Sequence, residues 1–219
     1  PEYFIKMGYE TAAVGKVFHH NDPTSWSIPW RNAKSPVYAS SKGKVVSECV
    51  DVPDDFYIDG KNTDIAIELM NTLNKGDKPF FLAVGYYRPH LPFVAPKKYW
   101  DLYERDDFKP APFQKVPKNG PEIACLSPKE LNQYIDIPKY NSFSESESDH
   151  LSVDRQKELL HGYYAATSYM DSQLQRVLNA LARLGVRNNT SIVLWGDHGW
   201  HLGDHGLWAK FTNFEQATH

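Results

Sequence analysis

Three short apolar runs along the chain predict buried β-strands. They are TAAVG at 11–15, KPFFLAVGYY at 78–87 and TSIVLWG at 190–196. A continuous apolar run of this length, bounded by polar or turn residues, is typical of a strand covered on both faces in a parallel sheet. We therefore expect three strands that pair side by side in the interior of the protein.

Two longer segments have apolar residues at helical spacing, and a third looks like the end of a helix. The pattern predicts amphipathic helices at 62–74 and about 152–184, and a short helical segment at 2–7. The expected boundary residues are Asn62 or Thr63 as the N-cap of the 62–74 helix, with Gly8 and Gly185 as the C-terminal breakers of the other two.

Strands and helices alternate along the chain, which predicts an α/β fold. The order favours a mostly parallel central sheet with helices on both faces. We expect residues 1–219 to form part of a single catalytic domain. The segments 21–60 and 97–150 are rich in proline and polar residues, and they predict loop-rich excursions with at most one hairpin in the first of them.

Each predicted strand is followed by charged or imidazole side chains. Because ligands bind beyond the carboxyl ends of strands in open α/β sheets, these clusters are expected to meet at one edge of the sheet. The three clusters are Lys16 with His19, Arg88 with His90, and Asp197 with His198.

The third cluster lies in GDHGWHLGDHGLWAK, residues 196–210, where glycines allow close approach of the backbone. A carboxylate beside an imidazole can bind a hard divalent cation, although Asp197 can equally cap the next turn while His198 is an ordinary polar residue. His201 and His205 are four residues apart, but Gly203 and the lack of a third ligand at a suitable spacing argue against zinc.

The remaining candidates suit an anionic substrate. Lys16 and Lys210 are cations beside apolar neighbours, as a tetrahedral anion requires, although either can be a solvated surface lysine. His19 and His90 are candidate proton carriers because imidazole titrates near neutral pH.

Composition narrows the class of protein. The chain has 219 residues with a net charge of −3, and no basic stripe indicates nucleic-acid binding. No segment approaches the roughly 20 apolar residues of a transmembrane helix. Cys49 and Cys125 either pair in an oxidising compartment or stay separate thiols, and both possibilities remain open.

Three segments together resemble a known family. GYETAAVGKVFHH, PFFLAVGYYRPHLPF and GDHGWHLGDHGLWAKFTNFEQATH are similar to type I sulfatases of the alkaline-phosphatase superfamily, within it to the iduronate-2-sulfatase and choline-sulfatase-like branches. The segments occur in family order from end to end of the chain. The resemblance implies a hydrolase that cleaves a sulfate ester, with a glycosaminoglycan or another sulfated sugar as the expected substrate.

The resemblance also implies roles for individual residues. Asp197 and His198 would be part of a calcium site. Lys16 and Lys210 would hold the sulfate oxygens, and His19 would assist the nucleophile. His90 would bind the sulfate and protonate the departing oxygen. The residues expected near the organic part of the substrate are Arg88 and Trp200.

One family element does not match. Type I sulfatases use a formylglycine made from Cys or Ser in a C-x-P-x-R or S-x-P-x-R motif, together with paired aspartates on the metal, and neither Cys49 nor Cys125 lies in such a motif. We therefore expect the chain to be a fragment, inactive by itself, of an enzyme whose nucleophile lies upstream. The family implies a lysosomal, secreted or periplasmic location.

Two other functions compete with this interpretation. Another hydrolase of the superfamily, acting on phosphodiesters or phosphonates, would share the metal and histidine groups. A non-catalytic binder of sulfated glycans would keep the anion site without the nucleophile. The sequence leaves the oligomeric state open.

Overall fold

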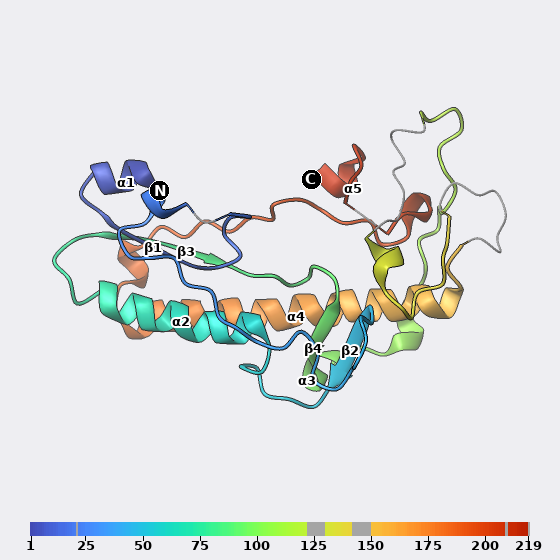
Figure 1. Cartoon of the computed structure of the whole chain (residues 1–219), viewed down its shortest axis with the longest axis horizontal. Coiled ribbons are helices and arrows are strands. Elements are labelled where there is room, and N and C mark those ends of the chain that lie inside the picture. The colour runs from blue at the N-terminus through green and yellow to red at the C-terminus, as the bar shows by residue number, and fades with distance from the viewer. Residues whose placement is uncertain (21, 122–129, 142–149, 209, 219) are drawn as a thin grey trace. The chain divides into compact units, whose positions relative to one another are not determined.

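The computed structural model describes residues 1–20, 22–121, 130–141, 150–208 and 210–218 (Figure 1). The chain forms two compact units, each assembled from segments that are distant in sequence. The first unit contains residues 1–39, 50–90 and 166–192, and the second contains residues 40–49, 91–165 and 193–219. The long helix α4 (Val153–Arg183) contributes residues to both units.

The first unit is built on a pair of parallel strands. Strand β1 (Glu10–Gly15) lies beside β3 (Phe80–Gly85), in a register that pairs Gly15 with Gly85 (Figure 1). Both strands therefore end at the same edge, as the parallel arrangement predicts. Two further helices belong to this unit, α1 (Glu2–Lys6) and α2 (Ile58–Leu73).

The core of the first unit lies between this strand pair and two helices. Buried side chains of β1, α2 and the C-terminal part of α4 form one apolar cluster, and an ion pair joins Asp64 of α2 to Arg176 of α4. Burial of these apolar groups is the main stabilising contribution. The buried members of the cluster are Ala12, Val14, Ala66, Leu69, Met70, Leu73, Val177, Ala180 and Leu181.

The second unit has its own core. It contains strand β2 (Ser47–Val50) except its last residue, strand β4 (Phe93–Pro96), which pairs with β2, and the short helices α3 (Lys97–Trp100) and α5 (Glu215–Thr218). Its buried cluster consists of Val46, Leu91, Phe93, Leu131, Tyr134, Ile137, Tyr140, Leu151, Leu159, Leu160 and Trp208.

Several expectations from the sequence are confirmed. The structure is α/β with a parallel strand pair, and the helices at 2–7 and 152–184 are present as α1 and α4. Gly8 and Gly185 have φ values of 89° and 74°, the left-handed conformation that favours glycine after a helix. No helix in the described ranges is both long and apolar enough to cross a membrane.

The start of α2 was predicted wrongly. The helix begins at Ile58, one turn before the expected N-cap, so Asn62 and Thr63 lie inside it. Both are fully buried because their polar groups have partners: the Asn62 side-chain oxygen accepts from the amide of Ala33, and the Thr63 hydroxyl donates to the carbonyl of Asp59. Local propensity pointed to a cap, and tertiary hydrogen bonds placed these residues in the helix interior instead.

The loop-rich segments contain more regular structure than expected. Strand β2 in the 21–60 segment pairs with β4, outside that segment, and not with a second strand among the described residues of 21–60. Strand β3 is half-buried along its whole length, whereas the apolar run predicted burial on both faces. β-structure depends on which neighbours are available, more than on the run itself.

The predicted third strand, 190–196, is not a strand. Within the described parts of the chain it pairs with no other segment, and Val193, Leu194 and Trp195 are 75%, 65% and 75% exposed. An apolar run forms a strand only where a neighbouring strand supplies backbone partners. Of the three strand ends predicted to meet at one edge, only those of β1 and β3 therefore lie together.

The close approach of the strand ends generates a prediction. A Cβ atom added at Gly85 would lie 2.0 Å from the carbonyl oxygen of Lys16, whereas one added at Gly76 would meet no atom nearer than 3.5 Å. We expect Gly85→Ala to lower the free energy of unfolding by roughly 2–3 kcal/mol, because overpacking forces the backbone apart. Gly76→Ala is the matched control. Urea denaturation measures both, and equal stability of the two variants would contradict the described backbone packing.

Candidate active site

The carboxyl edge of the β1–β3 pair brings two of the predicted clusters together. The amide of Lys16 donates to the carbonyl of Gly85 at 3.0 Å, so Lys16 follows β1 directly beside the start of the 86–90 loop. Lys16 is partly exposed, and His19 and His90 are exposed. A cation and an imidazole thus follow neighbouring strands, at the position where α/β sheets bind ligands.

The 86–90 loop is held by hydrogen bonds on both sides. The carboxylate of Asp59 accepts the amides of Tyr87 and Arg88, each at 2.9 Å. Arg88 Nη1 donates to the carbonyl of His90 at 2.7 Å, and the amide of His90 donates to the carbonyl of Tyr87 at 2.9 Å. Arg88 is only 9% exposed, so most of its surface is packed inside the unit.

Asp59 is a buried carboxylate that the sequence analysis missed. Its exposure is 0%, and burial raises its pKa, while the Arg88 guanidinium and the two backbone amides act in the opposite direction. The available signal was an acidic residue in the first turn of a helix. It was hidden because the sequence placed the helix start after this residue.

In the second unit, Asp197 and His198 follow the exposed 190–196 segment. His198 Nδ1 lies 2.8 Å from the carbonyl oxygen of Gly199, and Nε2 lies 3.6 Å from Asp197 Oδ2. Because a carbonyl only accepts, the contact places a proton on Nδ1, and Nε2 is the ring nitrogen that can face a cation. An oxygen donor and a nitrogen donor therefore lie side by side, and both side chains are accessible.

These two residues fit part of a divalent-cation site. Among the residues that the structure describes, no group of three or more His, Cys, Asp or Glu side chains could hold a metal ion. Calcium takes six to eight oxygen ligands, so two donors are insufficient by themselves. The pair can supply a share of the ligands in a larger set.

Lys210 lies beside an acidic residue and two aromatic rings. Its Nζ is 3.1 Å from Glu130 Oε1, 5.6 Å from the ring centroid of Trp200 and 5.2 Å from that of Phe211. The lysine and glutamate side chains are only 13% and 17% exposed. The sequence analysis missed Glu130, because 80 residues separate it from Lys210.

A buried polar network holds the loop between the metal candidates and Lys210. His201 is fully buried, with Nδ1 2.5 Å from Asp204 Oδ2 and Nε2 2.7 Å from the Thr212 hydroxyl oxygen. Both ring nitrogens of His201 are engaged within the loop. His205, its expected neighbour on a helical face, has a positive φ of 54°. The network joins Asp204 and Thr212 through one buried imidazole ring.

The predicted site residues fall into two groups. Lys16, His19, Arg88 and His90 belong to the first unit, and Asp197, His198, Trp200 and Lys210 belong to the second. The β1–β3 edge gathers the first group, and the 196–212 segment carries the second. A single site that contains both groups stays a prediction.

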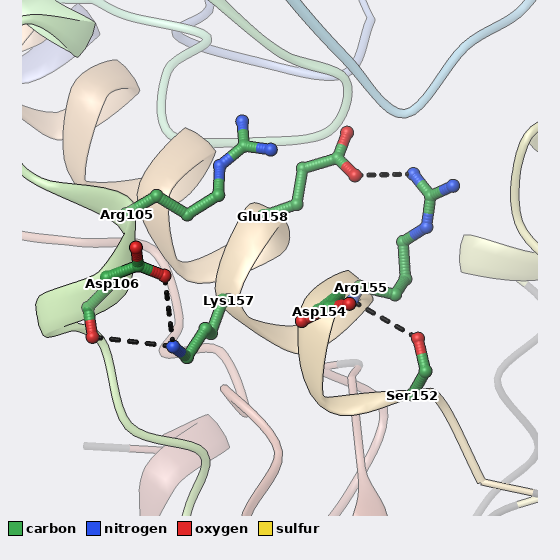
Figure 2. Close-up of a pocket in the computed structure, with 7 residues that line it drawn as sticks. All are labelled: Arg105, Asp106, Ser152, Asp154, Arg155, Lys157 and Glu158. Atoms are coloured by element: carbon green, nitrogen blue, oxygen red, sulfur yellow. Dashed lines mark hydrogen bonds and ion pairs between the residues drawn. The ribbon is translucent and has the colours of Figure 1, made fainter.

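The second unit also has a charged hollow of about 360 Å³ at the start of α4, which contains none of the predicted residues (Figure 2). Lys157 pairs with Asp106 at 3.3 Å, and Arg155 pairs with Glu158 at 2.7 Å. With Arg105 and Asp154, the lining has three cations and three carboxylates, so the hollow has no marked preference for an anion.

The chain belongs to the sulfatase family. The family model for sulfatases matches residues 1–219, the whole chain. Among curated proteins, the human protein named iduronate 2-sulfatase is 37% identical over 239 residues, covering 100% of this chain and 43% of that protein. A protein named sulfatase from Formosa agariphila is 31% identical over 238 residues, covering 100% of this chain and 45% of its own length.

Solved structures agree on the fold. A phosphonate monoester hydrolase of Agrobacterium radiobacter is similar with a TM-score of 0.66 and 18% sequence identity, covering 97% of this chain and 49% of that one. The chain therefore spans less than half the length of the curated relatives above and of this structure.

The network around His201 generates a prediction on pH. Burial tends to raise the pKa of Asp204, but the hydrogen bond and charge of His201 outweigh it and hold that pKa below the usual value of 3.8. Ionised Asp204 thus stabilises the folded state above pH 4, and this contribution is lost as the pH falls through the lowered pKa. We expect Asp204→Asn to reduce the unfolding free energy at pH 6 by about 1–3 kcal/mol.

The difference in unfolding free energy between the native protein and Asp204→Asn should then become smaller toward pH 3. Urea titrations at several pH values measure it. Asp64→Asn, which alters a half-exposed carboxylate paired with Arg176, is the control. A stability difference for Asp204→Asn that stays constant from pH 6 to pH 3 would refute the assignment.

Proposed function

We propose that the protein hydrolyses sulfate esters, with a sulfated sugar such as a glycosaminoglycan unit as substrate. The observation that carries the proposal is the adjacency of Lys16 and the Arg88–His90 loop at one strand edge, in a chain that matches the sulfatase family over its whole length. The identity to proteins named iduronate 2-sulfatase supports the sugar substrate.

The lysines bind the anionic group in this proposal. Lys16 and Lys210 donate to sulfate oxygens and offset the charge that develops as the ester bond breaks. For Lys210 to act in this way, its ammonium group exchanges Glu130 for the substrate, since the two are ion-paired here. Trp200, beside Lys210, borders the organic part of the ester.

The histidines move protons. His90 hydrogen-bonds the sulfate and protonates the departing sugar oxygen, which leaves poorly as an alkoxide. His19 assists the attacking group and its later regeneration. Arg88 was predicted to contact the organic part of the substrate. The burial of Arg88 and its hydrogen bond to the His90 carbonyl favour a structural role within the 86–90 loop instead.

Asp197 and His198 hold one divalent cation, proposed to be Ca²⁺, together with ligands from outside the described residues. A cation in such a site supplies stabilisation of negative charge on the reacting oxygens. The nucleophile is proposed to be a formylglycine, also from outside the described residues. A lysosomal, secreted or periplasmic location, which the family resemblance implies, is part of the proposal.

A second candidate function is hydrolysis of phosphodiesters or phosphonate esters. A protein of Trinickia caryophylli named multifunctional alkaline phosphatase superfamily protein PehA is 35% identical over 136 residues, 61% of this chain. Two lysines and a cation can bind a phosphoryl group as well as a sulfuryl group, so residue chemistry alone does not separate the two substrates.

A comparison of substrates tests the proposed function. The protein, produced from its full coding sequence, is assayed on sulfate, phosphate and phosphonate esters with the same leaving group. We expect the highest kcat/KM on the sulfate ester. Lys16→Met should lower it by about 10²–10³-fold through lost charge stabilisation. His90→Gln should lower it by about 10²–10⁴-fold through lost proton transfer.

Lys6→Met is the control, because Lys6 is exposed and pairs with Glu2. A preference for phosphonate or phosphodiester would favour the second candidate. Loss of activity in the Lys6 variant equal to that in the Lys16 variant would contradict the role of Lys16.

Metal content provides a test that is independent of turnover. We expect the full-length protein to retain about one divalent cation per chain after gel filtration, and Asp197→Asn to bind it more weakly because an anionic ligand is lost. Elemental analysis across a chelator titration measures this. Asp64→Asn, which alters a half-exposed carboxylate paired with Arg176 in the first unit, is the control. Identical metal retention in the Asp197 variant and the native protein would remove Asp197 from the ligand set.

A further inference from the structure

The most deeply buried carboxylate near the strand edge has no role in the proposed chemistry. Asp59 lies in the first turn of α2 and is 0% exposed. An ionised group in such a place is costly unless hydrogen bonds and opposite charges compensate it. Two backbone amides, the nearby guanidinium of Arg88 and the N-terminal end of a helix of 16 residues offset part of that cost, and burial still raises the pKa of Asp59.

The two amides belong to the loop that carries His90. They are the amides of Tyr87 and Arg88, the second and third residues after β3 ends at Gly85. The Arg88 side chain then turns to the carbonyl of His90, at 2.7 Å. Asp59 thus fixes the entry to the loop, and Arg88 fixes its exit.

We propose that Asp59 and Arg88 are positioning residues for His90, a buried pair that holds the 86–90 loop so that the imidazole reaches the leaving-group oxygen. The inference rests on the proposed role of His90 as proton donor. General acid catalysis needs the donor within hydrogen-bond reach of the oxygen, and a displacement of about 1 Å can cost on the order of 10²-fold in rate.

A carboxylate suits this position better than its amide analogue. Both oxygens of Asp59 accept, and each faces a backbone N–H. In Asp59→Asn one oxygen becomes an NH₂ group, which would point a donor at a donor. The variant keeps the volume of the side chain but loses one of the two bonds that fix the loop.

The first experiment measures the loop itself, without reference to activity. Hydrogen exchange by mass spectrometry follows the peptide that spans residues 86–90 in the native full-length protein, Asp59→Asn and Asp64→Asn. Asp64 is the matched control because it lies on the same helix, is half-exposed and bonds Arg176. We expect at least tenfold faster exchange in this peptide for Asp59→Asn alone. Unchanged protection would overturn the positioning role, whatever the enzyme turns over.

The second experiment asks whether the loop serves proton donation. Sulfate esters of phenols with different pKa values are compared, since a good leaving group needs little protonation and a poor one depends on it. We expect Asp59→Asn to lower kcat by about 10–100-fold on phenyl sulfate and by less than threefold on 4-nitrophenyl sulfate. His90→Gln should follow the same trend with a larger loss.

A uniform loss across the leaving groups would show that Asp59 supports the fold alone, and would overturn the inference while leaving the proposed function in place. A different outcome is faster exchange in Asp59→Asn together with a native protein that cleaves no sulfate ester. That outcome would refute the proposed function and with it the catalytic part of the inference. If Asp59→Asn fails to fold, Arg88→Lys replaces it in both experiments. That variant keeps the charge beside Asp59 but alters the donor to the His90 carbonyl, and it should show the same leaving-group dependence.

Discussion

The parallel pairing of β1 with β3 is the contact on which the candidate site depends. Its register brings Gly15 opposite Gly85, and both strands end together. Two segments separated by some 70 residues therefore emerge side by side, one with Lys16 and the other with the His90 loop. Because Gly85 leaves no space for a Cβ atom beside the Lys16 carbonyl, this approach requires a residue without a side chain.

Buried polar groups hold the functional loops in both units. In the first unit, Asp59 bonds backbone amides of the loop that carries His90. In the second, Asp204 and Thr212 bond His201 in the loop that precedes Lys210. The candidate site residues thus lie near residues whose hydrogen bonds order the backbone. Such satisfied networks rigidify a loop that hydrophobic packing alone would leave loosely defined.

The sequence predicted the elements whose signal is local. The amphipathic stripe of α4 and the glycine after it gave the right helix, and the apolar runs before Lys16 and Arg88 gave the right strands. The 190–196 run has the same local signal but no strand beside it among the described residues, and no local pattern reveals that difference. The start of α2 was misplaced because Asn62 resembles a cap and is in fact bonded to the distant Ala33.

The candidate site was predictable only in part for the same reason. The predicted site residues lie in recognisable sequence motifs. Their partners do not: Asp59 is 29 residues from Arg88, and Glu130 is 80 residues from Lys210. Partners at such distances are set by the tertiary fold.

The ion pair between Lys210 and Glu130 has a consequence for the thermodynamics of ligand binding. An anion that binds Lys210 as proposed competes with Glu130, a carboxylate that already contacts the lysine and that stays in the site after the exchange. Binding at this lysine is therefore a competition between two anions, and its strength is the difference between two similar energies.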